Sequence, residues 1–304
     1  MKNNPHPLRV HLFWIALLLL ALPMHLLAAD DTSAEEKFGR MQGVPASVSI
    51  GGGGMLPQGH AITAWNASYR SKYEGVEGEN QKNNRNIDNT TFVNMLKLRY
   101  GVTDNIEVQA VVPYTFYDPM AGHNLDSWGD IVVAGMYGFL QEKSGDPVSL
   151  ALSLKAGLPT GSTGPSALPG GDVWSGTAAL GLTKTWGLNQ VAFDLWATQP
   201  FEEGNSHVRK GDSYGFNYKY ARSLTQNLDV GIEGIIEHAN RGERYGVEMK
   251  NDYTEWYTGP AVTYNIPGTT IDLAVGAYLP VYRSYGQNTS SDSVRVDGKF
   301  FIFW

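Results

Sequence analysis

The sequence predicts an all-β fold: a transmembrane up-and-down antiparallel β-barrel of about twelve strands, behind a cleaved N-terminal signal peptide. Three observations predict it. Apolar and polar residues alternate with a period of two from residue 60 onward. The connections between the resulting strands are alternately short and long, and the last strand is apolar and aromatic. A barrel with both termini in the periplasm and long loops outside requires that alternation of loop lengths, whereas a soluble sandwich does not.

The composition fits a single barrel domain. The chain has 304 residues, 35 Gly, 17% charged residues, no Cys and a formal net charge of −7. Many glycines and few charges suit strands joined by tight turns, and they do not suit disorder. The absence of Cys excludes a lipidated Cys and a thiolate metal site. An acidic chain without a basic stripe argues against nucleic acid as a partner, and no pattern indicates a cofactor.

Residues 1–29 have the form of a secretory signal peptide. Lys2 and Arg9 precede the apolar run 12–22, which Pro23 ends, and the small residues Ala28 and Ala29 follow. The run is shorter than the roughly 20 residues that a spanning helix needs. The sequence therefore predicts export, with the bacterial outer membrane as the destination.

Residues 30–59 differ from the rest of the chain. Four consecutive glycines, 51–54, disfavour regular structure and lack the Lys-Ser/Thr of a phosphate loop, so we expect a flexible hinge there. We expect the whole segment to form a flexible periplasmic leader. The alternative is a small plug folded into the lumen. Residues 60–304 then form the barrel.

The period of two is clearest at 105–116, where Ile106, Val108 and Ala110 oppose Glu107 and Gln109. The predicted strands are 61–73, 91–100, 105–116, 128–140, 148–158, 173–186, 190–201, 212–222, 227–238, 252–266, 270–282 and 293–304. Most have about ten residues or slightly more, as tilted spanning strands require.

Turn residues separate these strands. Tight turns rich in Gly, Asn, Asp and Pro follow residues 100, 186, 222 and 266, and a slightly longer one covers 141–147. The predicted long loops are 74–90, 117–127, 159–172, 202–211, 239–251 and 283–292. Aromatic residues gather toward strand ends, where interface girdles lie.

The last predicted strand closes the barrel. Val294, Val296, Phe300, Ile302 and Trp304 share one face and are expected to meet outer-membrane lipid. The opposite face carries Arg295, Asp297 and Lys299. The aromatic end, Phe300, Ile302 and Trp304, resembles the C-terminal signal that the barrel assembly machinery recognises, with Trp where Phe is usual.

Charged and polar residues collect on the inward-facing positions of the strands. Because Lys or Arg on the lipid face near the midplane costs about 2–4 kcal/mol, this pattern fits a polar lumen. The predicted lumen-lining residues are Lys97, Arg99, Glu107, Gln109, Asp130, Lys155, Asp194, Lys219, Glu233, Glu255, Asp272, Arg295, Asp297 and Lys299. They fit either a pore or a lumen closed by ion pairs, and a count near twelve strands does not decide between the two.

The sequence predicts no catalytic and no metal site. The histidines of the mature chain are His60, His123, His207 and His238, and none lies in a Gly-x-Ser-x-Gly or His-Glu-x-x-His context. His123 lies near Asp118 and Asp126 in a loop. His207 with Glu202 and Glu203 lacks fixed ligand spacing.

The run 98–108, Leu-Arg-Tyr-Gly-Val-Thr-Asp-Asn-Ile-Glu-Val, resembles the strand and turn of the outer-membrane family described as MetA-pathway of phenol degradation. Pro113-Tyr114, Gly129-Asp130-Ile131 and the run 157–161 are similar to other pieces of it, and the resemblance spans about residues 55–304. It implies a channel or transporter for passive passage of small hydrophobic or aromatic molecules. The alternatives are a structural or surface-interaction barrel with a closed, salt-bridged lumen, and an outer-membrane hydrolase.

Overall fold

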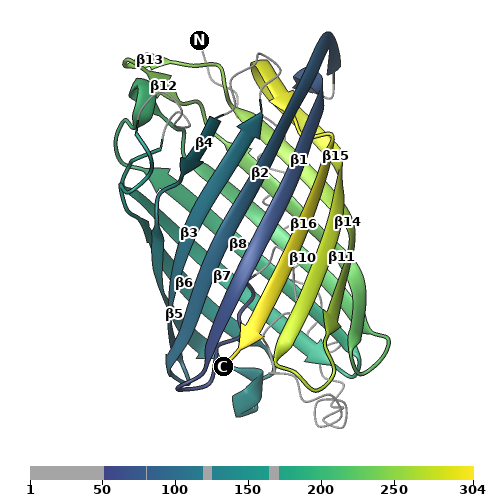
Figure 1. Cartoon of the computed structure of the whole chain (residues 1–304). Coiled ribbons are helices and arrows are strands. Elements are labelled where there is room, and N and C mark those ends of the chain that lie inside the picture. Colours follow the sequence, from purple (N-terminus) through teal and green to yellow (C-terminus); the bar gives the residue numbers. More distant parts are fainter. Residues whose placement is uncertain (1–50, 80, 119–124, 164–170) are drawn as a thin grey trace.

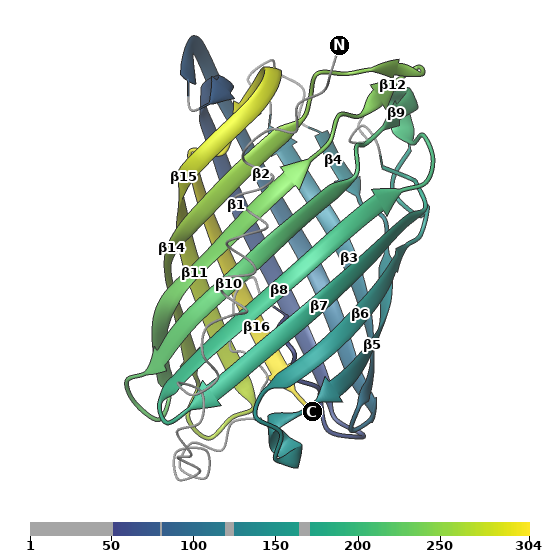
Figure 2. The same cartoon turned by 180° about the vertical axis from the view of Figure 1, so that it is seen from behind.

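The chain forms a closed antiparallel β-barrel with strongly tilted strands (Figures 1 and 2). The computed structural model describes residues 51–79, 81–118, 125–163 and 171–304. The predicted signal peptide, most of the predicted leader, and His123 lie outside the described residues. Within the described part, no helix is long and apolar enough to span a membrane.

Consecutive strands of the wall are neighbours throughout, and β2 also pairs with β3, which completes the ring. The wall contains β1 (Ala61–Glu79), β2 (Gln81–Thr103), β3 (Ile106–Asp118), β4 (Leu125–Trp128), β5 (Val132–Leu140), β6 (Ser149–Gly157), β7 (Ser175–Trp186), β8 (Asn189–Pro200), β10 (Ser213–Ser223), β11 (Leu228–Ala239), β14 (Tyr253–Asn265), β15 (Ile271–Ser291) and β16 (Val294–Phe303). Because β4 and β5 both pair with β3 and follow one another, these 13 segments make twelve wall strands in the described residues.

The predicted fold class is therefore confirmed, and each predicted strand has its counterpart. The closing pair is β1 with β16, in register from Ile62 opposite Phe303 to Ser71 opposite Val294. The C-terminus lies at the end of the barrel with the short turns (Figure 1). Two of those turns place a glycine at positive φ, Gly187 at 53° and Gly268 at 73°, which residues with a Cβ rarely adopt.

Two of the predicted long loops are wrong, because they continue as strands. β1 and β2 pair beyond the expected loop start at residue 74, and β15 extends through most of 283–292. There β15 pairs with β1, from Glu74 opposite Ser291 to Glu79 opposite Ser284. These extensions are polar, so the alternation of apolar residues does not reveal them. Backbone pairing needs no apolar face.

Two other predicted loops pair with one another. β9 (Val208–Arg209), β12 (Glu243–Arg244) and β13 (Val247–Glu248) form a small three-stranded sheet above the barrel rim (Figure 2). Two short 3-10 helices, η2 (Glu142–Ser144) and η3 (Asn205–His207), lie in the turn after β5 and in the loop before β9. The long-loop end of the barrel is thus partly ordered by contacts between loops.

The outer face of the wall is apolar. The large exposed hydrophobic side chains of this face include Trp65, Leu96, Leu98, Val108, Leu154, Leu195, Ile232, Val275 and Leu279, each 40–60% exposed. They occupy alternate positions on strands whose remaining positions point inward. Such a surface is unfavourable in water and favourable in lipid.

Candidate functional site: the barrel interior

The predicted lumen residues occupy the inner positions of the strands. On β2, Lys97 and Arg99 alternate with the outward-facing Leu96 and Leu98. Many of the inner charges are closely packed: Arg99, Glu107, Lys219, Glu233, Asp272 and Asp297 are each at most 9% exposed. The interior is therefore a polar, partly filled space, and the role of these residues in passage remains a prediction.

Residues 51–58, named here the inner segment, lie against the inside of the wall. The amide groups of Gly51 and Gly52 donate to the two carboxylate oxygens of Asp194, at 2.6 and 2.8 Å. Further along, the Leu56 amide donates to Glu107 Oε2 at 3.2 Å. Side chains of the wall thus supply the acceptors that this irregular backbone lacks.

Glycines on both sides permit this close contact. A Cβ at Gly181 of β7 would lie 2.2 Å from the Gly52 oxygen, and one at Gly101 of β2 would lie 2.3 Å from the Pro57 oxygen. In the segment itself, a Cβ at Gly53 would lie 2.1 Å from the Ser149 oxygen. The expectation of a flexible hinge at 51–54 is therefore wrong. Glycine can make a segment flexible, and because it has no side chain it can also let one backbone pack closely on another. The sequence alone does not distinguish between these two roles.

An apolar cluster anchors the end of the inner segment. Leu56 is fully buried and packs with residues from β1, β14, β15 and β16, with Phe303 beside them. Met55 is 1% exposed and packs with Met136 and Ala151 of β5 and β6. The cluster around Leu56 contains Ile62, Ala64, Ala261, Ala274 and Phe301. The segment is thus held by buried apolar contacts as well as by hydrogen bonds.

A buried ion pair lies next to this cluster. The Arg99 guanidinium donates to both oxygens of Glu107, at 2.5 and 2.8 Å, and Gln109 Nε2 donates to the same carboxylate at 2.9 Å. Arg99 also reaches the Gly54 oxygen at 3.4 Å. Because Glu107 is fully buried, the bidentate pair and the Leu56 amide satisfy a carboxylate that no water reaches.

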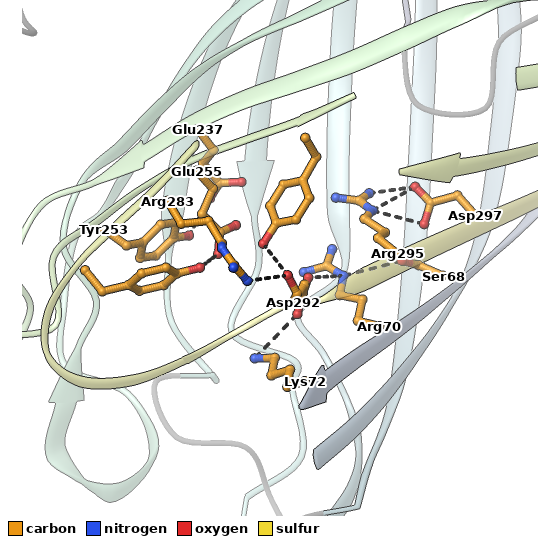
Figure 3. A network of polar contacts seen from close by, with 12 residues as sticks. Ser68, Arg70, Lys72, Glu237, Tyr253, Glu255, Arg283, Asp292, Arg295 and Asp297 are labelled. Atoms are coloured by element: carbon orange, nitrogen blue, oxygen red, sulfur yellow. Dashed lines mark hydrogen bonds and ion pairs between the residues drawn. The ribbon is translucent and has the colours of Figure 1, made fainter. Parts of the chain in front are cut away.

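The other half of the interior carries a looser network (Figure 3). Asp292 faces Arg70 Nε at 3.9 Å and Lys72 Nζ at 3.8 Å. The Tyr257 hydroxyl donates to the Asp292 backbone oxygen at 3.1 Å. Arg295 and Asp297, neighbours on the inner face of β16, pair at 2.8 Å.

Tyrosine hydroxyls satisfy three glutamates of this inner wall. Tyr253 donates to Glu237 at 2.5 Å and Tyr278 to Glu233 at 2.9 Å. Tyr285 donates to Glu255. Each pair joins two different strands among β11, β14 and β15, so the network ties the wall together laterally.

Two cavities inside the barrel are lined by described residues. The larger has a volume of about 370 Å³ and is lined by the inner segment, Lys97, Gln109, Lys155 and Asp194. The smaller has about 270 Å³ and is lined by Arg70, Glu237, Arg295 and Asp297. Trp196 and Asn217 line both, so the two cavities meet there.

Two predicted lumen residues form hydrogen bonds in the loops and turns at the ends of the barrel. The Asp130 carboxylate accepts the amides of Thr160, Gly161, Asp172 and Val173 at 2.8–3.3 Å and thereby holds the loop between β6 and β7. It is not among the residues that line either cavity. Asp272 accepts from Asn265 Nδ2 at 2.6 Å across the turn between β14 and β15.

The predicted assembly residues lie on β16 and at its end. Phe300 and Ile302 are half-buried, and Trp304 is 67% exposed. The Trp304 indole donates to Thr63 Oγ1 of β1 at 3.1 Å. Phe301, between them, points inward into the cluster around Leu56. The assembly role of these three residues remains a prediction.

The described histidines are dispersed. His238 contacts Thr254 and Asn240, His207 faces Glu203 at 3.7 Å, and His60 contacts the Gln58 oxygen. In the described part of the chain, no three His, Asp or Glu side chains gather as metal ligands would.

The sequence does not single out several residues that shape the interior. Thr183 and Gln141 accept the amides of Gly53 and Met55, both at 3.0 Å. Trp196 and Asn217 line both cavities. The only signal for them is their inward position, since neutral side chains do not stand out in a charge pattern.

The apolar outer face, the closed wall and the polar interior define a bacterial outer-membrane β-barrel. The family model described as "Putative MetA-pathway of phenol degradation" matches residues 65–296, and the chain belongs to this family. No curated protein sequence matches the chain.

Some solved structures are similar to this chain. An outer membrane channel from Pseudomonas putida F1 has a TM-score of 0.71 and 14% identity, and the match covers 85% of this chain and 100% of that one. The NanC porin has a TM-score of 0.48 at 7% identity, covering 80% and 99%. The translocator domain of the autotransporter NalP from Neisseria meningitidis has a TM-score of 0.44 at 11% identity, covering 91% and 98%.

Proposed function

We propose that this barrel is a channel for passive passage of small molecules, without enzymatic activity. The observation that carries the proposal is the pair of interior cavities, about 370 and 270 Å³, which meet at Trp196 and Asn217 and are lined by polar side chains. A purely structural barrel gains nothing from such cavities, since empty or hydrated space costs packing contacts. The similar fold of a protein described as an outer membrane channel supports the same function.

Hydrophobic or aromatic compounds are the proposed solutes, since the family is described by phenol degradation. In this proposal residues 1–29 are removed on export. Residues 30–59 act from the periplasmic side, where the inner segment narrows the lumen through its contacts with Asp194 and Glu107. The polar network around Asp292 lies toward the outer mouth and selects among entering solutes.

Conductance in planar bilayers tests this proposal. The mature chain is compared with a variant that lacks residues 30–58, and both must first show the heat-dependent gel shift of a folded barrel. We expect discrete current steps from the mature chain and larger or longer steps from the variant, because the inner segment no longer occupies part of the lumen. Absence of current above background from both folded proteins would remove the channel hypothesis.

A closed structural barrel is the second candidate. The buried Arg99–Glu107 pair and the packing of Leu56 favour it, because they seal one side of the lumen. The two candidates differ in the intact mature chain: a structural barrel is silent while residues 30–58 seal the lumen, whereas a channel conducts with them in place.

A further inference from the structure

The larger cavity has the size and the mixed lining of a ligand site. Its volume of about 370 Å³ lies within the range of about 300–1,000 Å³ that small-molecule pockets occupy. Two adjacent rows of inner positions form its wall. One row contains Lys155, Thr177 and Thr198, and the next contains Met136, Ser153, Ala179 and Trp196.

Two ammonium groups of this cavity have no paired anion. In the part of the chain that the structure describes, neither Lys97 nor Lys155 forms a hydrogen bond or ion pair with another side chain. The charges around Lys97 are those of Arg99, Lys299 and Lys155, with Glu107 and Asp194 as opposing charges. Glu107 is already bound to Arg99. Clustered cations are unfavourable in a space of low dielectric constant, and an anion in the cavity would relieve their repulsion.

The carboxylate of Asp194 also lines this cavity and is an opposing charge for both lysines, although it forms no ion pair with either in the described part of the chain. Its two oxygens accept the Gly51 and Gly52 amides at 2.6 and 2.8 Å. Counting Lys97 and Lys155 against Asp194, the charged groups that line the cavity carry one net positive charge.

A buried hydroxyl in the cavity wall lacks a partner. Ser153 is 6% exposed, and its Oγ forms no hydrogen bond, although it lines the cavity two residues before Lys155 on the same inner face of β6. Such a group is costly to bury unless something binds it. A carboxylate held by Lys97 and Lys155 would accept a hydrogen bond from this hydroxyl.

The row that contains Ser153 is otherwise largely apolar and includes an aromatic plane. Met136, Ala179 and Trp196 line the same cavity. A Cβ at Gly215 of β10 would lie 2.5 Å from Trp196, so the indole lies directly against the strand where glycine leaves room. A flat apolar body can pack on this surface while its charged group meets the two lysines.

From these contacts we propose that the larger cavity binds a small organic anion, a carboxylate on an aromatic or apolar body, with Lys97, Lys155 and Ser153 at the carboxylate and Trp196 at the body. The inference rests on the proposed function and names its class of solute.

Binding calorimetry on the purified full mature chain in detergent tests this, with benzoate, benzyl alcohol and acetate as probes. Benzoate has both the ring and the charge, benzyl alcohol the ring alone, and acetate the charge alone. We expect benzoate to bind about tenfold more tightly than either of the others, because only it meets both parts of the cavity. Equal affinity for benzoate and benzyl alcohol would overturn the proposal.

Variants of the two lysines test whether benzoate binds in this cavity. In Lys97→Gln/Lys155→Gln the affinity for benzoate should fall about tenfold or more. The matched control Lys250→Gln removes the same kind of charge from an exposed loop residue and should leave it unchanged. Unchanged benzoate binding in a folded double variant contradicts the inference. If the double variant lacks the heat-dependent gel shift, the comparison of probes on the unaltered chain decides.

Currents in planar bilayers separate this inference from the proposed function. Benzoate binding without any current removes the channel and keeps the site. Current that benzoate does not block, together with equal affinity for benzyl alcohol, removes the site and keeps the channel.

Discussion

The two halves of the barrel interior are held by different kinds of contact. Near the short turns, the fully buried Leu56 and the bidentate Arg99–Glu107 pair leave little space. Toward the long loops, Asp292 faces Arg70 and Lys72 at 3.8–3.9 Å, and the Arg70 side chain is 37% exposed. Buried charges are costly to separate, whereas exposed pairs contribute little. The comparison indicates a firm periplasmic half and weaker contacts around Asp292 in the outer half, which also holds the largely buried Arg295–Asp297 pair at 2.8 Å.

The largest expected effect concerns the closing strand at the firm end. Replacing Trp304 with Asp places a charge where an exposed indole contacts Thr63 of β1. We expect barrel assembly in the outer membrane to fail or fall severely, as measured by the heat-dependent gel shift of membrane fractions. Tyr245→Asp, at an exposed loop aromatic near the opposite end, should assemble normally. Normal insertion of Trp304→Asp would refute the assembly role of this residue.

Removing the buried carboxylate should cost the most stability among folded variants. Glu107→Ala leaves Arg99 buried without its partner, and we expect a loss of about 3–5 kcal/mol in unfolding free energy. Denaturant unfolding in detergent or lipid measures it. The double variant Arg99→Ala/Glu107→Ala removes the unpaired charge as well, so it should be less destabilised than Glu107→Ala. An equal or larger loss in the double variant would contradict this account of the pair.

A wall glycine tests the inner segment directly. Gly181→Ala places a Cβ 2.2 Å from the Gly52 oxygen, so the segment must shift. Such overpacking costs about 1–3 kcal/mol, and we expect faster protease cleavage within residues 51–58. Gly135→Ala is the matched control, since a Cβ there meets nothing within 4 Å. Equal cleavage rates in both variants would show that this contact does not hold the segment.

A substitution in the outer half should change the unfolding free energy of the barrel only slightly. Arg70→Gln removes a half-exposed charge 3.9 Å from Asp292, and the expected change in unfolding free energy is about 0–1 kcal/mol. The same denaturant series as for Glu107→Ala measures it. A loss comparable to that of Glu107→Ala would erase the distinction between the two halves.

The smallest effect on barrel stability is expected from a substitution in a loop. The exposed Arg241 contacts Glu248 and Asp252, both at 2.8 Å, and these hydrogen bonds raise the pKa of its guanidinium. Arg241→Ala should leave barrel unfolding unchanged and increase only proteolysis in the loop 239–251. A shift of the barrel transition would mean that this loop stabilises the wall.

Sequence and structure agree best where a pattern repeats along a strand. The period of two places Lys97 and Arg99 inward and Leu96 and Leu98 outward, as the structure has them. Residue types alone do not reveal contacts between distant segments. The charge of Asp194 is visible in the sequence, but its use as acceptor for Gly51 and Gly52, more than 140 residues away, is not.

Asp130 illustrates the same difference at the rim. Its inward position predicts a lumen residue, yet its carboxylate collects loop amides and lines neither cavity. Polar character is a local property, whereas the partner of a polar group depends on which loop the closed barrel brings near it.

By itself the sequence determined the barrel, its strands and the two faces of each strand, because a strand between lipid and a polar interior must alternate along its length. Only the tertiary structure decided what fills the interior. The position of the inner segment and the cavity between Lys97, Lys155 and Trp196 arise when the wall closes. Closure places opposite strands face to face, and contacts across a lumen leave no periodic trace in the chain.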